Sequence, residues 1–318
     1  MPHGSFKTAL VLSGGSARAL AHLGVLEELQ KNRIRVDMVV GCSMGAIIGG
    51  LYAYYGDVAP VIEKMRELVE SDLFLNAVSA ASEDSPSVLT NGFLNRFIWL
   101  FRRGVYYTHS MIRPTLVTEE TYSEIMNDLL PDHPIEDLSI PFASVALDLL
   151  SGEEVVSRKG SLRKAVAASA AIPGLLPPIE LRGRTLVDGG WTDNVPVAPA
   201  IAMGAHFVIA SDACLDIPHL GALPTSAIES LFRCNEITRI LLNRHRKAYA
   251  DIELIPDIGA LYWANFGELD RCRSAGREAF RARAARIRRR RRLRLCQTLM
   301  GLLHPCRRGG WRHHFVMD

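Results

Sequence analysis

Residues 36–54 read VDMVVGCSMGAIIGGLYAY, and this stretch decides the fold class. The apolar residues 36–40 predict a buried strand that ends at a glycine, and the small, apolar residues 44–54 predict a helix packed closely under a sheet. Between the strand and the helix, residues 41–45 (GCSMG) fit the pattern Gly-x-Ser-x-Gly. In that pattern a serine, here Ser43, occupies a sharp strand-to-helix turn at the end of a sheet.

The spacing of this motif has a chemical reason. Gly41 and Gly45 flank Ser43 at a distance of two residues, so no neighbouring side chain clashes with the strained turn. The N-terminus of the following helix then directs its amides and its partial positive charge at a developing anion. A turn of small residues that serves only packing matches the same five letters, but the flanking strand and helix favour Ser43 as a catalytic nucleophile.

The chain upstream of the motif has the same order of elements. Residues 8–13 predict a buried strand that stops at a glycine pair, and residues 17–29 carry leucines on one face, as an amphipathic helix requires. Strand, helix, strand and helix within about fifty residues favour a parallel α/β sheet. Further strands are expected at residues 140–147, 185–187 and 206–210, and helices at residues 162–170 and 228–249.

The turn between the first strand and the first helix is a second candidate element. In a parallel sheet this turn lies beside the end of the next strand, so the amides of Gly14, Gly15, Ser16 and Ala17 are expected next to the candidate nucleophile. Acyl transfer needs hydrogen-bond donors where the carbonyl oxygen becomes negative, and each is worth roughly 10²–10³ in rate. A simple tight turn is the alternative, and the spacing fits neither Gly-x-Gly-x-x-Gly nor a Walker loop.

The third element is Asp188, which follows a short strand and precedes Gly189 and Gly190. Taken alone, Asp-Gly-Gly is commonly a turn. Together with residues 21–26 (AHLGVL), residues 168–174 (ASAAIPG) and Asn194-x-Pro196, the three elements in this order resemble the bacterial patatin-like phospholipase family over about residues 7–212.

That resemblance implies a three-layer α/β/α sandwich with a mostly parallel central sheet, and hydrolysis of acyl esters of phospholipids or other lipids by a Ser-Asp dyad. Carried over by position, Ser43 is the nucleophile and Asp188 the base, while the loop amides with Arg18 form the oxyanion hole. The family usually has glycine where this chain has Ser16 and Ala19. If Ser16 needs a positive φ, serine is unfavourable there, so a catalytically weak scaffold is the competing interpretation.

Other residues compete for the catalytic roles. A Ser-His-Asp triad would need one of the histidines placed beside the serine, and a buried cysteine or another aspartate could replace the assigned residues. No histidine lies in a convincing catalytic turn. The candidates for the histidine are His22, His206, His219 and His245; Cys42 is the alternative nucleophile, and Asp148, Asp193 and Asp212 are the alternative bases.

Charge divides the chain of 318 residues into an acidic body and a basic tail. The net charge is +3, yet residues 271–318 hold 15 arginines and only 2 acidic residues, so this segment carries +13 and the body −10. We therefore expect a catalytic domain over residues 7–212, completed by residues 213–270, and an Arg-rich tail over residues 271–318.

Three partners fit the tail: an anionic membrane, nucleic acid, or the protein's own acidic body. The membrane is preferred over nucleic acid, because leucines follow the arginine run 288–292.

Residues 93–103 form an aromatic island that predicts either a lid that contacts lipid or an ordinary buried helix. The six cysteines are not spaced as zinc or disulfide pairs, and no signal peptide or membrane span is recognisable. We expect a cytoplasmic, in part peripheral, enzyme without metal or organic cofactor.

Overall fold

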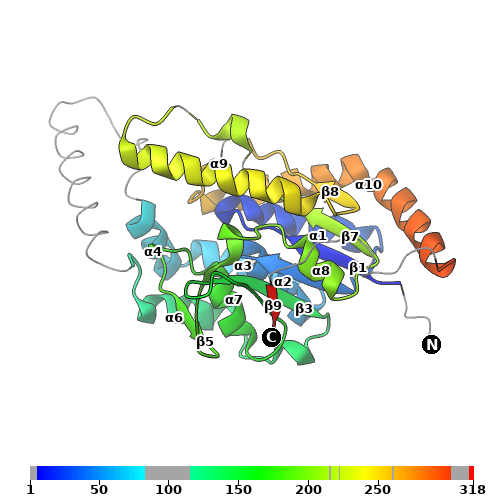
Figure 1. Ribbon diagram of the computed structural model, residues 1–318, viewed down its shortest axis with the longest axis horizontal. Coiled ribbons are helices and arrows are strands. Elements are labelled where there is room, and N and C mark those ends of the chain that lie inside the picture. The colour runs from blue at the N-terminus through cyan, green and yellow to red at the C-terminus, as the bar shows by residue number, and fades with distance from the viewer. Residues whose placement is uncertain (1–5, 83–114, 215, 222, 260, 302–314) are drawn as a thin grey trace.

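A mostly parallel β-sheet lies at the centre of the molecule, between layers of helices (Figure 1). The computed structural model describes residues 6–82, 115–214, 216–221, 223–259, 261–301 and 315–318. Their strands form a nine-stranded sheet in the order β5-β6-β3-β2-β1-β7-β8, with β4 paired to both β3 and β9. The strands are β1 (Thr8–Leu12), β2 (Met38–Cys42), β3 (Phe142–Asp148), β4 (Glu154–Ser157), β5 (Ile179–Leu181), β6 (Arg184–Asp188), β7 (Phe207–Ser211), β8 (Ile252–Leu254) and β9 (Phe315–Met317).

The direction of the strands decides where a site can form. The neighbours β3, β2, β1, β7 and β8 are all parallel, whereas β4 and β6 run antiparallel to β3. The carboxyl ends of β1, β2 and β7 therefore lie at one edge of the sheet, where ligands bind in open α/β folds. The predicted α/β class with a mostly parallel sheet is confirmed.

Alternating side chains along the strands supply both faces of the sheet with apolar surface. Leu10 and Leu12 of β1 belong to the core under one helical layer, and Ala9 and Val11 belong to the core under the other. The helices are α1 (Ala21–Lys31), α2 (Met44–Tyr55), α3 (Val58–Glu70), α4 (Asp72–Ser82), α6 (Glu119–Leu129), α7 (Leu162–Ala170), α8 (Val197–Ala202), α9 (Ala227–Lys247) and α10 (Leu269–Leu299), with the short 3₁₀ helices η1 (Ser16–Leu20), η3 (Ile135–Asp137), η4 (Gly189–Trp191), η5 (Ile217–His219) and η6 (Phe266–Glu268).

Two predicted boundaries differ from the structure. The helix expected at residues 17–29 begins as the 3₁₀ helix η1, because the left-handed backbone at Ser16 (φ +50°) makes a tight turn in which the Arg18 amide donates to the Gly15 carbonyl at 3.1 Å. The strand expected at residues 36–40 is shifted to Met38–Cys42, since its pairing with β1 starts at Met38. The other predicted strands and helices are found within a few residues of their expected positions.

Helix α10 holds the first part of the expected Arg-rich tail, residues 271–318, against the rest of the chain. It begins at Leu269, ends at Leu299 and packs along α1. Gly24 of α1 and Gly276 of α10 permit this contact: a Cβ at either position would lie 1.9 Å from a backbone oxygen of the other helix. Phe280 and Ile287 of α10 are fully buried. Residues 271–299 of the Arg-rich segment are thus part of the folded body.

Ion pairs join the inner side of α10 to the acidic body. Arg273 and Arg277 both pair with Glu27, and Arg281 pairs with Glu28 at 2.7 Å. Further along the helix, Arg294 lies 2.6 Å from Asp251. For these arginines, the protein's own acidic body is the partner.

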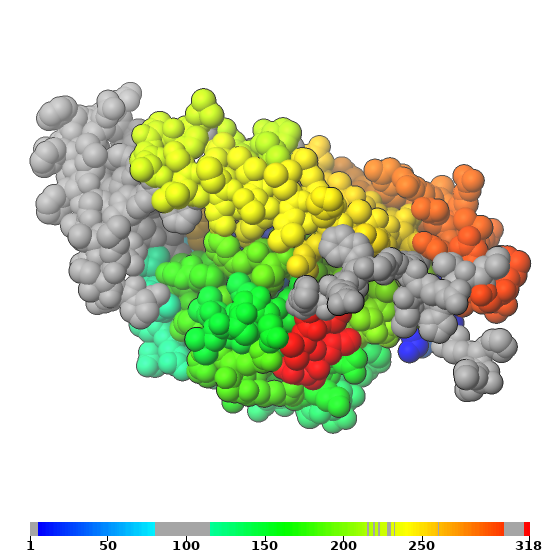
Figure 2. Space-filling model, in the orientation of Figure 1, coloured from blue at the N-terminus to red at the C-terminus, as the bar shows by residue number. Residues whose placement is uncertain are grey.

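The distal end of α10 lies far from α4 in Figure 1, and Figure 2 shows the same separation on the surface. Arg291 of α10 lies 3.3 Å from the Thr8 hydroxyl at the start of β1, at the sheet edge opposite the carboxyl ends.

At another margin of the sheet, β9 (red in Figure 2) pairs in parallel with β4. None of the helices in the described ranges is long and apolar enough to cross a lipid bilayer.

Candidate active site

Ser43 lies on the sharp turn between β2 and α2, as the motif predicts. Its backbone has φ +54° and ψ −127°, a strained conformation for a residue with a side chain. The flanking glycines allow the turn, because a Cβ at Gly41 would lie 2.4 Å from the Gly45 carbonyl oxygen and a Cβ at Gly45 would lie 2.3 Å from that of Leu12. The turn is therefore closely packed against the end of β1.

Ser169 holds the strained turn in place. Its hydroxyl accepts a hydrogen bond from the Ser43 amide at 3.0 Å and donates one to the Val145 carbonyl at 2.6 Å. Ser169 is fully buried at the end of α7. The sequence analysis used this residue only as part of a family motif, and the structure shows that it connects the Ser43 turn to β3.

Asp188 ends β6 and points at Ser43. Its carboxylate lies beside the Ser43 hydroxyl and accepts a hydrogen bond from the Gly190 amide at 2.7 Å. Burial raises the pKa of Asp188, although the Ser43 hydroxyl and the Gly190 amide favour the charged form. A carboxylate with a raised pKa is a better base for a serine hydroxyl than an ordinary aspartate. The structure thus brings together the two residues to which the catalytic roles were assigned.

Only part of the predicted oxyanion loop has free amide donors. The Gly14 amide donates to Asn194, the Ala17 amide to the Trp263 carbonyl at 3.0 Å, and the Arg18 amide to the Gly15 carbonyl. The Arg18 guanidinium donates to the Leu261 carbonyl at 3.1 Å.

Three of the five predicted donors therefore already have acceptors. The amides of Gly15 and Ser16 have no acceptor among the described residues, and neither has the Met44 amide at the start of α2. These three amides are the available donors near Ser43.

The positive φ that was expected to be unfavourable at Ser16 is present, at +50°. For a residue other than glycine, such a conformation costs of order 1 kcal/mol or more. Ala19, the second departure from the family pattern, is fully buried in η1.

Asn194 is a site residue that the sequence analysis did not assign. Its Oδ1 accepts the Gly14 amide at 3.1 Å, and its backbone amide donates to the Oδ1 of Asn243 on α9 at 3.2 Å. A Cβ at Gly14 would lie 2.4 Å from this Oδ1, and one at Gly190 would lie 2.9 Å from it. Asn194 therefore fixes the spacing between the oxyanion loop and the Asp188 turn. Its place in the Asn-x-Pro motif was the available signal.

The described histidines do not complete a triad. His22 is fully buried, with its ring nitrogens 2.9 Å from the Ser13 carbonyl and 2.8 Å from the Ser211 hydroxyl. Burial lowers the pKa of His22 to about 4, so the ring is a neutral support under the oxyanion loop at neutral pH. His206 accepts the Lys7 amide at the opposite edge of the sheet, and His245 is exposed on α9. The side chain of His219 lies outside the described residues.

The alternative nucleophile and bases have other partners. Cys42 is fully buried 3.8 Å from the Asp188 carboxylate, and burial raises the pKa of its thiol. Asp148 pairs with Arg184 at 3.0 Å. Likewise, Asp193 pairs with Arg246 at 3.1 Å and Asp212 with Lys247 at 2.7 Å. Within the described residues, none of these three aspartates is hydrogen-bonded to Ser43.

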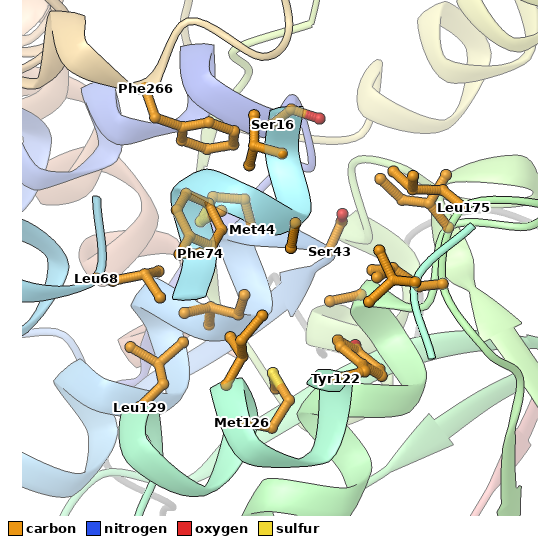
Figure 3. A pocket seen from close by; sticks show the side chains of 18 of the residues that line it. Ser16, Ser43, Met44, Leu68, Phe74, Tyr122, Met126, Leu129, Leu175 and Phe266 are labelled. Carbon is orange, nitrogen blue, oxygen red and sulfur yellow. The ribbon is translucent and has the colours of Figure 1, made fainter. Parts of the chain in front are cut away.

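An apolar pocket of about 100 Å³ opens beside Ser43 (Figure 3). Its walls come from α2, α3, α4, α6 and the segments around Leu175 and Phe266. The Tyr122 hydroxyl on the wall donates to the Ala167 carbonyl at 2.7 Å. The Ser43 hydroxyl therefore lies at one side of a cavity that suits a hydrocarbon chain.

The aromatic island at residues 93–103 lies outside the described residues. Among the residues that are described, no cluster of three His, Cys, Asp or Glu side chains is placed to hold a metal ion.

Comparison with known families supports the resemblance found in the motifs. The model of the family described as patatin-like phospholipase matches residues 10–201. An uncharacterized NTE family protein of Mycobacterium tuberculosis (strain ATCC 25618 / H37Rv) is 31% identical over 204 residues, which cover 64% of this chain and 48% of that protein. The chain thus spans about half the length of this relative.

Two eukaryotic relatives match a similar length of the chain. Lysophospholipase NTE1 of Mycosarcoma maydis is 30% identical over 203 residues, which cover 64% of this chain and 9% of that protein. Patatin-like phospholipase domain-containing protein 6 of Homo sapiens is 32% identical over 206 residues, which cover 64% of this chain and 13% of the relative.

Proposed function

The chain belongs to the patatin-like phospholipase family, and from this premise we propose that it is a serine acyl hydrolase that cleaves ester bonds of phospholipids or other lipids through a Ser43–Asp188 dyad. The observation that carries this proposal is the position of the buried Asp188 carboxylate beside the Ser43 hydroxyl, at the mouth of an apolar pocket. The name of the fungal relative, a lysophospholipase, supports a lipid ester as the substrate.

The first half of the reaction forms an acyl-enzyme. Asp188 accepts the hydroxyl proton as Ser43 Oγ bonds to the ester carbonyl carbon. The amides of Gly15, Ser16 and Met44 stabilise the negative oxygen. The bond from carbon to the leaving oxygen then breaks, and Asp188 returns the proton to the alcohol.

Water completes the cycle in the second half of the reaction. Asp188 takes a proton from a water molecule that attacks the acyl carbon, and the bond to Ser43 Oγ breaks as Oγ recovers its proton. Residues 213–270 belong to the same catalytic unit in this proposal, because Asn243 of α9 holds Asn194 beside the oxyanion loop.

A fluorophosphonate probe tests the nucleophile directly. We expect wild type to be labelled and to hydrolyse p-nitrophenyl butyrate, and Ser43→Ala to do neither, because the probe reacts only with an activated hydroxyl. Ser151→Ala, in the exposed turn after β3, is the matched control and should be labelled like wild type. A wild type that is neither labelled nor able to hydrolyse the ester would instead support the catalytically weak scaffold, with the backbone at Ser16 as the leading cause.

The exposed arginines of α10 support a second part of the proposal, peripheral contact with anionic membranes in the cytoplasm. Five of them have no ion-pair partner within the described ranges: Arg283, Arg286, Arg289, Arg290 and Arg292. The exposed Leu293, Leu299 and Met300 near the end of the helix favour a lipid surface over nucleic acid. Because these residues lie at the edge opposite Ser43, the contact would tether the enzyme rather than position its pocket.

Vesicle flotation with phosphatidylserine membranes tests the tether. Each arginine near an anionic surface contributes about 1 kcal/mol, so replacing these five arginines by glutamine should weaken binding by roughly 10³–10⁴-fold. The control replaces Arg273 and Arg277, which pair with Glu27, and should bind nearly as well as wild type. Equal binding of the five-arginine variant and wild type would contradict the tether, and loss of RNA binding alone would favour nucleic acid.

A further inference from the structure

The pocket beside Ser43 ends at a thin wall of side chains. Figure 3 shows the Ser43 hydroxyl on one side of the pocket and Leu68 and Leu129 on the other. Leu68 belongs to α3, whereas Ile125 and Leu129 are one turn apart on the same face of α6. All three side chains line the pocket. A chain bound with its carbonyl at Ser43 therefore meets this wall when it fills the pocket.

A second hollow lies on the other side of the same wall. It has a volume of about 310 Å³ and is formed by α3, α6 and the start of α4. Leu68, Ile125 and Leu129 line this hollow too, and the rest of its lining includes Lys64, Glu67 and Asp128. The hollow therefore offers polar surface beyond the wall, where the end of a longer chain could emerge.

The wall is only one layer of side chains thick. Leu68 and Ile125 are each 8% exposed, and Leu129 is 3% exposed. Each of the three contacts both cavities, so no second layer of residues separates them at this point. Truncation of a single side chain can therefore open a passage.

We propose that Leu68, Ile125 and Leu129 set the upper limit of acyl-chain length, and that the hollow between α3 and α6 is the extension that a longer chain would enter. This inference rests on the proposed acyl hydrolase function. It assigns the pocket of about 100 Å³ to the acyl chain and leaves the alcohol part of the ester outside it.

The hydrophobic effect predicts the form of the chain-length profile. Each methylene buried in the pocket raises kcat/KM by roughly fourfold. Once the chain end reaches the wall, added methylenes gain no further burial, so kcat/KM stops rising with chain length. The break in the profile is the chain length at which this happens. Opening the wall moves the break to longer chains without changing the reaction at Ser43.

A series of p-nitrophenyl esters from butyrate to palmitate measures the break, with each kcat/KM divided by the value for butyrate. We expect Leu129→Ala to move the break by about two carbons, because the truncation removes three carbon atoms from the wall. Leu68→Ala, on the other side of the wall, should produce the same shift and serves as the second variant if Leu129→Ala does not fold.

Two controls separate the wall from a general loss of packing. Leu129→Met conserves volume and should leave the break where it is in wild type. Leu26→Ala truncates a fully buried leucine that lines neither cavity and should also leave it unchanged. An unmoved break in both wall variants, with butyrate still hydrolysed, overturns the inference. Absence of butyrate hydrolysis in wild type would instead overturn the proposed function.

Discussion

Asp188→Asn is expected to lower kcat for p-nitrophenyl butyrate by roughly 10²–10⁴-fold, the usual contribution of a positioned general base. Asparagine has the shape of aspartate, and its Oδ1 can still accept the Gly190 amide that lies 2.7 Å from the carboxylate in wild type. It cannot accept the proton of the Ser43 hydroxyl. Steady-state kinetics with a soluble ester isolates this loss, because no membrane binding is involved.

The same variant should be as stable as wild type or more stable. Burial raises the pKa of Asp188, so the folded protein pays a cost to hold this carboxylate charged at neutral pH, and the neutral amide avoids that cost. Thermal unfolding of both proteins at pH 7 measures the difference. A loss of activity that accompanied a large loss of stability would point to misfolding and not to a missing base.

The pH dependence provides an independent check on this assignment. A base must be unprotonated, so kcat/KM of wild type should fall as pH falls through the raised pKa of Asp188, above the ordinary value of about 3.9. Asp148→Asn is the matched control, because Asp148 pairs with Arg184 away from Ser43. Unchanged turnover in Asp188→Asn would place the base elsewhere.

The strand-turn-helix elements were predictable from the sequence because each leaves a local signal. The run of small residues after Ser43, the glycines around it and the apolar strands before it all follow from packing a helix closely under a parallel sheet. The pairing of Ser43 with Asp188, which are 145 positions apart, came from resemblance to a family. Periodicity alone does not specify which later aspartate reaches the end of β2.

The hydrogen bonds of the oxyanion loop were not predictable in this way. Glycines at residues 14 and 15 indicate a tight turn, but the acceptors of the loop amides come from distant segments: Asn194 binds the Gly14 amide and Trp263 the Ala17 amide. Nothing local to the loop determines which amides stay free. Contacts between segments so far apart in sequence depend on the complete fold.

The contacts of helix α10 were not predictable for a different reason. The arginine count identified the acidic body as one possible partner, but charge alone predicts neither a register nor a fixed contact. The apolar or small residues Leu269, Cys272, Gly276, Phe280 and Ile287 follow helical spacing and are buried in the structure. The helical spacing of these residues was present in the sequence, but the many arginines between them made the apolar face of the helix difficult to recognise.

Gly276→Ala is expected to destabilise the protein by about 1–3 kcal/mol, the usual cost of overpacking. At an ordinary helical position the same substitution is stabilising by about 1 kcal/mol, because alanine has the higher helix propensity. Here the new Cβ would lie 1.9 Å from the Ala21 carbonyl oxygen of α1, so the helices must separate. Separation would also weaken the pairs that Arg273 and Arg281 form with Glu27 and Glu28. Denaturant unfolding of wild type and variant measures the change.

The matched control is Gly267→Ala in η6, where the nearest atom to a new Cβ is 3.8 Å away. This variant should unfold like wild type. Gly24→Ala should resemble Gly276→Ala, because its Cβ would lie 1.9 Å from the Arg273 carbonyl oxygen on the facing helix. The double variant should cost less than the sum of the two single variants, since one separation of α1 from α10 relieves both clashes. A stabilising Gly276→Ala would contradict the close backbone contact between α10 and α1 at this position.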